Sequence, residues 1–108
     1  MTSKRIGAIR ILLDNAIEAA KECDEKIINL EIRKESKRNR QILLIENTYN
    51  NKDVDTEKIY EKNFSTKQGN SGLGLWEVRQ ILKKNTNLNL FTSKTDKFFK
   101  QQLEMYNI

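Results

Sequence analysis

Three of the four glycines of this chain fall within six residues, and this cluster constrains the fold more than any other feature of the sequence. Gly69, Gly72 and Gly74 lead directly into an amphipathic helical pattern. Glycines at this spacing let the backbone take positive φ and turn its N–H groups into one concavity, and the N-terminus of the following helix adds a favourable dipole. The cluster therefore predicts a phosphate site, with a flexible turn before an ordinary surface helix as the alternative.

The spacing of this cluster differs from the familiar phosphate-binding patterns. It matches neither G-x-x-x-x-G-K-[ST] nor G-x-G-x-x-G, and no strand-like apolar run precedes it, which argues against a P-loop and a dinucleotide-binding turn. Ser65, Thr66 and Lys67 precede the cluster and supply two hydroxyls and a cation beside the predicted anion. A second part of the site must come from elsewhere in the chain.

The composition excludes several classes of protein. At 108 residues, with 37% hydrophobic and 32% charged residues, the sequence predicts a single soluble domain, cytosolic in character, that spans residues 1–108. Its start, almost at the first long helix, suggests a domain excised from a longer protein. The single cysteine, Cys23, cannot form an internal disulfide. The absence of histidine excludes a histidine general base and any histidine-containing zinc site within the chain.

The net charge of +5 raises the possibility of nucleic-acid binding. Five basic residues crowd one short segment: Arg33, Lys34, Lys37, Arg38 and Arg40. Glutamates are interleaved with them and no aromatic residue among them can stack on a base, so a solvated hairpin tip is the better interpretation.

Hydrophobic periodicity predicts the elements. Residues 3–23 form a helix whose buried stripe contains Ile6, Ile9, Leu13, Ala16 and Ala20, widened by Leu12 and Ala19. A β-hairpin over 27–34 and 40–47 has its most buried part at Leu43, Leu44 and Ile45. A short helix at 56–62 follows, then a helix with its apolar face at Leu75, Val78, Ile81 and Leu82 that can end at Asn85 or Asn87. Strands near 88–92 and 98–106 complete the chain. This order predicts an α+β, two-layer sandwich with helices on one face of an antiparallel or mixed sheet.

Asn15 is the second notable residue. Asparagine is a mediocre helix former, yet Asn15 lies within the strongly helical segment LLDNAIEAA, beside a polar face with Glu18 and Glu22. Its side-chain carbonyl is a hard ligand suited to Mg²⁺, which takes few protein ligands and completes its shell with waters and substrate phosphates. A hydrogen bond to a neighbouring loop remains the alternative.

Together, DNAIEAA at 14–20 and NFSTKQGNSGLGL at 63–75 resemble the nucleotide-binding boxes of the superfamily that joins gyrase, Hsp90, histidine kinases and MutL. The chain most resembles the catalytic domain of sensor histidine kinases, especially peptide quorum-sensing receptors similar to the accessory-gene-regulator sensor. The resemblance covers nearly the whole chain. It implies a Bergerat-type fold that binds ATP and Mg²⁺.

The resemblance also implies roles for individual residues. Asn15 matches the asparagine that ligates Mg²⁺, and Asn47 stands where the family usually has an adenine-binding aspartate. The remaining positions match the phosphate-binding loop and its lid: Phe64, Ser65, Thr66, Lys67, Gly69, Gly72, Leu73, Gly74 and Leu75. Three positions depart from the family pattern. Asn47 brings no charge to adenine, Ile11 stands where hydrolytic relatives have a glutamate, and Glu18 replaces a frequent basic residue.

The implied function is that of the catalytic part of a two-component kinase. The domain would hold Mg-ATP while a histidine on a separate dimerisation domain attacks the γ-phosphate, with a response regulator downstream. It would contact neither nucleic acid nor the membrane itself, as the cytoplasmic portion of a membrane-bound kinase. The alternative is a non-catalytic ATP-binding or protein-interaction module of the same fold.

Overall fold

The computed structural model describes residues 3–50 and 74–106. In chain order the elements are α1 (Ser3–Lys21), β1 (Ile28–Glu35), the 3-10 helix η1 (Ser36–Arg38), β2 (Arg40–Thr48), α2 (Gly74–Lys84), β3 (Leu88–Lys94) and β4 (Phe98–Tyr106). The helices and strands predicted in these ranges are confirmed to within a few residues, whereas the short helix predicted at 56–62 lies outside the described residues.

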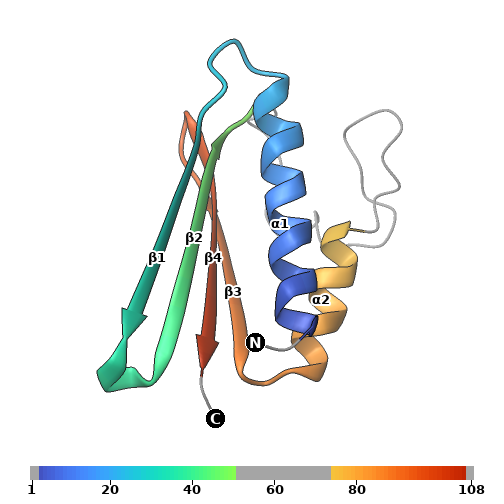
Figure 1. The fold of residues 1–108 in the computed structure, drawn as a ribbon. Helices are drawn as coiled ribbons and strands as arrows, with labels where there is room; N and C mark the ends of the chain where they lie inside the picture. The colour runs from blue at the N-terminus through green and yellow to red at the C-terminus, as the bar shows by residue number, and fades with distance from the viewer. Residues whose placement is uncertain (1–2, 51–73, 107–108) are drawn as a thin grey trace.

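The strands form one sheet in the order β1-β2-β4-β3, and every neighbouring pair is antiparallel. Both helices lie on the same side of this sheet, with α1 packed against β2 and α2 packed beside α1 (Figure 1). The structure is therefore the predicted two-layer α+β sandwich, with an antiparallel rather than a mixed sheet. Within the described ranges, no helix is long and apolar enough to cross a bilayer.

The core lies between the sheet and the helices. Its buried residues are Leu12, Ala16, Leu43, Ile45, Val78, Leu88, Leu103 and Met105. Side chains alternate between the two faces of a strand, so Leu43 and Ile45 point towards the helices and Leu44 points away. The prediction that Leu44 belongs to the most buried part of the hairpin is therefore wrong, because Leu44 is only partly buried on the far face.

On that far face, polar and charged side chains lie over the two central strands, β2 and β4. Ile42 is only 4% exposed, and Glu104 stands opposite it in register. Arg40 forms an ion pair with Glu104 at 3.1 Å and another with Glu35. The hydrogen bond from Arg40 lowers the pKa of the Glu35 carboxyl. This ionic cluster covers part of the sheet face opposite α1 and α2.

The predicted buried stripe of α1 is rotated from the observed one. The helix buries Ala8, Leu12, Ala16 and Ala20, while Ile6, predicted to be buried, is 54% exposed. Alanine side chains allow close approach of the helix to the sheet and to α2, so the small residues occupy the contact. Ile9 and Leu13 lie at the border of the core and are partly buried. A row of large aliphatic side chains is thereby left along the outer side of α1.

The predicted end of α2 is confirmed. The side chain of Asn85 donates to the carbonyl of Ile81 at 2.7 Å, and its backbone N–H donates to the carbonyl of Leu82 at 3.3 Å. Lys83 and Lys84 occupy the last turn, where cations suit the helix dipole. The following segment turns directly into β3.

Candidate functional site

The described candidate site residues lie on three neighbouring elements. Asn15 lies on α1, Asn47 near the end of β2, and Gly74 and Leu75 at the start of α2. Since α1 packs against both β2 and α2, it is the central element of the site (Figure 1). The predicted site residues Phe64, Ser65, Thr66, Lys67, Gly69, Gly72 and Leu73 lie outside the described residues.

Asn15 has hydrogen-bonding capacity that the described part of the chain does not use. Its side-chain Nδ2 is buried and has no hydrogen-bond partner among the described residues. A buried polar group without a partner costs roughly 1–3 kcal/mol, so such a group usually has a function or a further partner. On the helix, Asn15 follows the buried Leu12 and precedes the buried Ala16, which turns it inwards rather than to solvent. The role of Asn15 as a ligand of Mg²⁺ therefore stays a prediction, and the unused hydrogen-bonding capacity of its side chain agrees with it.

The residues present fit a magnesium ion that is shared with a nucleotide. Within the described ranges, no group of three or more carboxylate, cysteine or histidine side chains forms a dedicated metal cage. Mg²⁺ needs no such cage, because it commonly takes one or two protein oxygens and completes its shell with waters and phosphate oxygens. The side-chain oxygen of Asn15 is a donor of this kind. A lone amide on α1 therefore suits a metal that arrives with its substrate.

Asn47 presents an acceptor on the helix-facing side of the sheet. It is 2% exposed, and its Nδ2 donates to the carbonyl of Thr48 at 2.9 Å. Because a carbonyl can only accept, this contact identifies Nδ2 as the donor of the amide and Oδ1 as its acceptor atom. Asn47 shares its sheet face with Ile45, two residues earlier, so the acceptor faces the helical layer.

Two polar residues on the same face of the sheet as Asn47, one buried and one partly buried, were not predicted from the sequence. Thr92 on β3 donates its hydroxyl to Oε1 of Gln101 on β4 at 2.5 Å, and Gln101 is only 5% exposed. Gln101 is in register with Ile45, which puts it on the helix-facing side of the sheet with Thr92. The signal for them is strand alternation: each falls two residues from an inward leucine, Leu90 on β3 and Leu103 on β4.

Tyr49 adds a further buried polar group at the same end of the sheet. It is 7% exposed, its hydroxyl donates to the carbonyl of Thr95 at 2.6 Å, and its ring lies 5.9 Å from that of Phe99. Burial raises the pKa of the Tyr49 hydroxyl above its usual value, and the nearby charge of Asp96 raises it further. The tyrosine therefore stays neutral and holds the end of β2 against the β3–β4 turn.

Thr48 connects this end of the sheet to the segment between α1 and β1. Its Oγ1 donates to the carbonyl of Glu25 at 2.8 Å and accepts from the N–H of Ile27 at 3.1 Å. The side chain of Asn50 donates to the carbonyl of Glu22, just beyond α1, at 2.8 Å. These contacts anchor the C-terminal end of α1 beside Asn47. We call the set Asn47, Tyr49, Thr92 and Gln101 the polar end of the sheet.

Two residues of α1, Ile11 and Glu18, depart from the family pattern, and neither supplies a proton acceptor that points inwards. Ile11, one turn before Asn15, is partly buried and packs against the hydrophobic core. Its hydrocarbon side chain cannot take a proton from water. Glu18 is exposed.

Comparison with known proteins identifies the family. A sequence profile described as the GHKL domain matches residues 6–106 of this chain. The chain belongs to the GHKL family. GHKL domains generally bind ATP, which agrees with the phosphate site predicted from the glycines and with the nucleotide-binding boxes recognised in the sequence. Among curated proteins, none matches the chain at a significant level.

Solved structures of histidine kinases share the fold. A nucleotide-free catalytic domain of the histidine kinase ThkA superposes with a TM-score of 0.71 at 22% identity, and a second nucleotide-free form with 0.70 at 21%. The mycobacterial sensor histidine kinase MprB gives 0.66 at 20% identity. These matches cover 96%, 95% and 92% of this chain but only 66%, 67% and 67% of the solved chains. The present chain thus spans about two thirds of their length.

Proposed function

We propose that this chain is the ATP-binding catalytic domain of a sensor histidine kinase of the peptide quorum-sensing type. It binds Mg-ATP and presents the γ-phosphate to a histidine on a separate dimerisation domain, from which a response regulator is phosphorylated. The proposal includes cytoplasmic localisation as part of a membrane-bound kinase. It rests on GHKL membership, on the shared fold and on one local observation.

That observation is the Nδ2 atom of Asn15 on α1, which is buried and has no hydrogen-bond partner among the described residues. It occupies the family position for a magnesium ligand, and α1 lies against the helix that follows the glycine cluster. Bound magnesium would neutralise charge on the transferring phosphoryl group. Asn15 would ligate Mg²⁺, Asn47 would offer its Oδ1 to the adenine amine, and the backbone of Gly72, Leu73, Gly74 and Leu75 would hold phosphate.

The phosphoacceptor must come from another domain. Transfer to histidine needs an imidazole nitrogen in line with the γ-phosphate, and this chain has no histidine. With Ile11 in place of a glutamate base, water attack on bound ATP should also be slow. The chain therefore positions and activates ATP without forming a covalent intermediate itself.

A non-catalytic ATP-binding module is the second candidate. Asn47 favours it, because the usual aspartate would accept from adenine through a charge-assisted hydrogen bond and asparagine does so only through a neutral one. In such a module, nucleotide would act only as a conformational signal. The two candidates differ in whether phosphate leaves ATP for a histidine.

One experiment separates them. The domain is first titrated with ATP, with and without Mg²⁺, by calorimetry or by the fluorescence of Trp76, which adjoins the glycine cluster. It is then incubated with γ-labelled ATP, alone and with the histidine-bearing dimerisation domain of its parent kinase. We expect magnesium-dependent binding, no acid-labile label on the domain alone, and label on the partner. A domain that binds Mg-ATP and docks to the partner without labelling it is the non-catalytic module.

A further inference from the structure

The hydrogen-bonded pair of Thr92 and Gln101 interrupts the apolar lining of the sheet. Thr92 on β3 lies directly opposite Gln101 on β4, and its hydroxyl donates to Oε1 of Gln101 at 2.5 Å. Gln101 is only 5% exposed. One inward layer further along the same strands, Leu90 lies opposite the completely buried Leu103. A polar pair thus takes a place where the neighbouring layer has two leucines.

Stability does not account for this pair. Burial of an amide costs about as much free energy as one good hydrogen bond returns, whereas an aliphatic side chain at the same place would stabilise the fold. Glutamine carries two N–H donors and two acceptor positions, and the bond from Thr92 occupies one acceptor position. Ligand pockets are lined mainly by apolar side chains with a few polar groups that select the ligand, and the pair fits this pattern.

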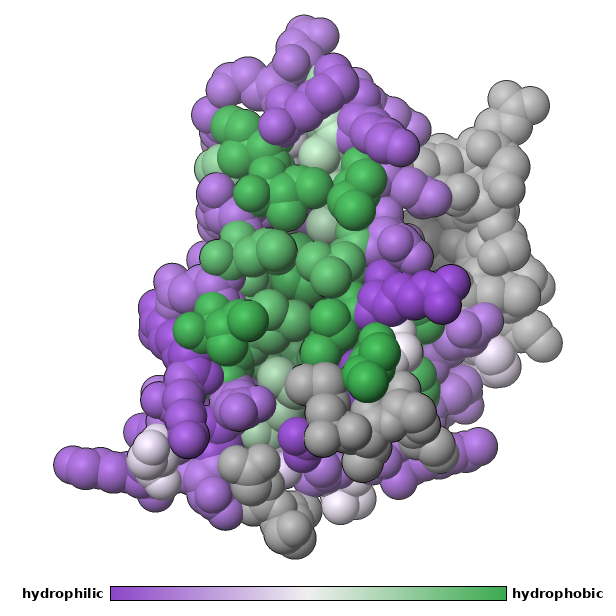
Figure 2. All heavy atoms as spheres, viewed as in Figure 1, coloured by the Kyte–Doolittle hydropathy of each residue, from purple (hydrophilic) through white to green (hydrophobic). Residues whose placement is uncertain are grey.

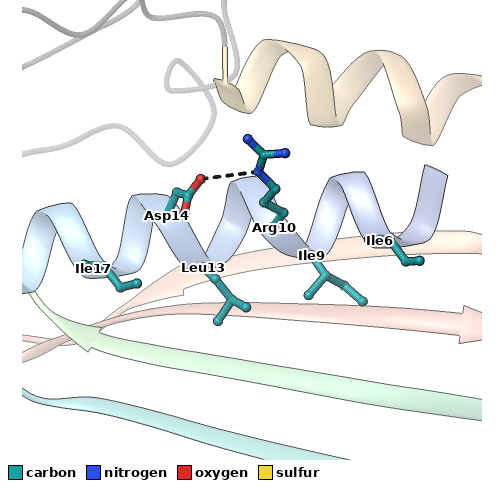
Figure 3. A pocket seen from close by; sticks show the side chains of 6 residues that line it. All are labelled: Ile6, Ile9, Arg10, Leu13, Asp14 and Ile17. Atoms are coloured by element: carbon teal, nitrogen blue, oxygen red, sulfur yellow. Dashed lines mark ion pairs between the residues drawn. The ribbon is translucent and has the colours of Figure 1, made fainter. Parts of the chain in front are cut away.

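The outer side of α1 has a different chemistry. Its aliphatic side chains line a shallow groove: Ile6, Ile9, Leu13 and Ile17 (Figure 3). Figure 2 shows hydrophobic residues gathered in a band on this side of the molecule. Aliphatic side chains bury area but cannot distinguish ligands by their hydrogen-bonding groups. The amides that can do so, Asn47 and Gln101, lie on the helix-facing side of the sheet at its polar end.

Gln101 is a diagonal neighbour of Asn47 across the pair of β2 and β4. Gln101 lies opposite Ile45, and Asn47, two residues further along β2, lies opposite Phe99. Diagonal neighbours on one face of an antiparallel pair are about 7–8 Å apart, within reach of two side chains that contact the same small molecule. Both amides are buried, so a ligand that contacts them is shielded from water.

The two amides carry opposite hydrogen-bonding groups. Nδ2 of Asn47 donates to the carbonyl of Thr48, so Oδ1 is its acceptor atom. Oε1 of Gln101 accepts from Thr92, so Nε2 is its donor atom. An acceptor and a donor on neighbouring strands match a ligand edge that has a donor beside an acceptor. Adenine has such an edge on either side of its amine, with N1 or N7 as the acceptor.

We propose that Gln101 is a specificity-determining residue for the base, with its Nε2 donating to the ring nitrogen N1 or N7 beside the adenine amine. The role rests on the ATP binding proposed above. Thr92 is a positioning residue, because its hydroxyl holds Oε1 and thereby directs Nε2. Guanine has an oxygen in place of the amine and sets an acceptor against the acceptor of Asn47. The bond from Gln101 also offsets the neutral contact of Asn47, since charge-assisted hydrogen bonds are roughly twice as strong.

Nucleotides that lack one ring nitrogen test the role of Gln101. The whole chain is titrated by calorimetry with the magnesium complexes of ATP, 1-deaza-ATP and 7-deaza-ATP. We expect the wild type to bind one of the two analogues about tenfold more weakly than ATP, which identifies the ring nitrogen. Gln101→Met keeps the length of the side chain without the amide. It should bind ATP about tenfold more weakly than the wild type does, and bind that analogue as well as it binds ATP.

Two variants of Thr92 separate positioning from packing. Thr92→Val removes the hydroxyl at nearly constant volume and should reduce the preference for ATP over the analogue to about threefold. Thr92→Ser keeps the hydroxyl and should retain the full preference. Gln102→Met is the matched control on β4, because Gln102 lies on the far face and its Nε2 donates to Glu104 at 2.9 Å. That variant should leave the preference unchanged.

The possible results distinguish this role from the proposed function. Equal affinity of the wild type for ATP and both analogues overturns the role of Gln101, and so does a preference that survives in Gln101→Met. In both cases ATP binding itself stands and the pair is purely structural. A wild type that does not bind ATP overturns the proposed function together with this role. Far-ultraviolet circular dichroism checks that each variant is folded, and the comparison of nucleotides in the wild type needs no variant.

Discussion

The two ends of the helix-facing side of the sheet differ in chemistry. At one end Leu43, Leu103 and Met105 are buried in a purely hydrophobic cluster beneath α1 and α2. At the polar end, side chains of similar burial carry amides and hydroxyls, as in Asn47 and Gln101. Both ends belong to the same strands, so strand geometry does not explain the difference.

A gain in stability explains the residues at the apolar end but not those at the polar end. Burying a leucine contributes about 1.5–3 kcal/mol relative to leaving it exposed, whereas a buried amide at best recovers what its desolvation costs. A sheet selected only for stability would be apolar throughout. The polar end, together with Asn15 on α1, is therefore the part of the domain that we assign to ligand binding, and substitutions at the two ends should affect different properties.

The largest effect on stability is expected at the apolar end. Leu103 is completely buried, so Leu103→Ala removes transfer free energy and leaves a cavity. We expect a loss of about 3 kcal/mol in the free energy of unfolding, measured by urea denaturation. Where the variant is still folded, its affinity for ATP should be close to that of the wild type.

Leu44→Ala is the matched control for this prediction. Leu44 lies on the neighbouring strand but on the far face, where it is only partly buried. The loss should be clearly smaller than at Leu103, since fewer contacts disappear. Equal losses at the two positions would contradict the division into a core face and a far face.

Asn15→Ala should produce the opposite result. Replacing a side chain whose buried Nδ2 has no partner among the described residues with the best helix former should leave the free energy of unfolding unchanged or raise it by up to about 1 kcal/mol. Affinity for Mg-ATP should nevertheless fall by about a hundredfold, roughly 2.8 kcal/mol, and become independent of Mg²⁺. Calorimetric titrations with and without the metal measure both quantities.

Asn89→Ala serves as its control, because Asn89 is an exposed asparagine on β3. That variant should change neither the stability nor the metal dependence. If Asn15→Ala retains magnesium-dependent binding, the assignment of Asn15 as a metal ligand fails.

At Asn47 a smaller, mixed effect is expected. Asn47→Ala removes the hydrogen bond to the carbonyl of Thr48 and should cost about 1 kcal/mol of stability. Loss of the Oδ1 acceptor should also weaken ATP binding about tenfold and reduce any preference for ATP over GTP. Competition between the two nucleotides tests this role. An unchanged preference would show that adenine is recognised by other residues.

The sequence predicted the layers of this fold better than the orientation of its elements. The helical and alternating patterns were strong enough to predict α1, α2 and the strands. The buried side of α1 was misassigned by part of a turn, because Ile6 fits a hydrophobic stripe as well as Ala8 does. Hydrophobicity alone does not reveal that small residues occupy the closest helix contacts, nor that Ile6 lies in the exposed aliphatic row on the outer side of α1.

For the site, sequence reasoning proposes residues only where a motif exists. Asn15 and Asn47 belong to recognisable segments, and the structure places both on adjoining elements. Thr92 and Gln101 belong to no motif, and they meet only because β3 and β4 pair in one register. Cross-strand pairing of this kind depends on tertiary structure and is not encoded in local spacing.

The smallest effect should come from Tyr49, which supports the polar end without being assigned to the ligand. Tyr49→Phe removes the hydrogen bond to Thr95 and should lower the free energy of unfolding by about 1 kcal/mol near neutral pH. It should also remove part of the pH dependence. The pKa of Tyr49 is raised in the folded state, so its stabilising contribution is complete below the unfolded pKa of about 10 and declines as the pH rises through the folded value. The wild type should therefore lose stability from about pH 10 upwards more steeply than Tyr49→Phe does. Urea denaturation of both proteins at a series of pH values measures the difference, in which contributions from lysines cancel. Parallel curves would show that the hydroxyl ionises as easily in the folded domain as in the unfolded chain, and that the polar end is open to solvent at this point.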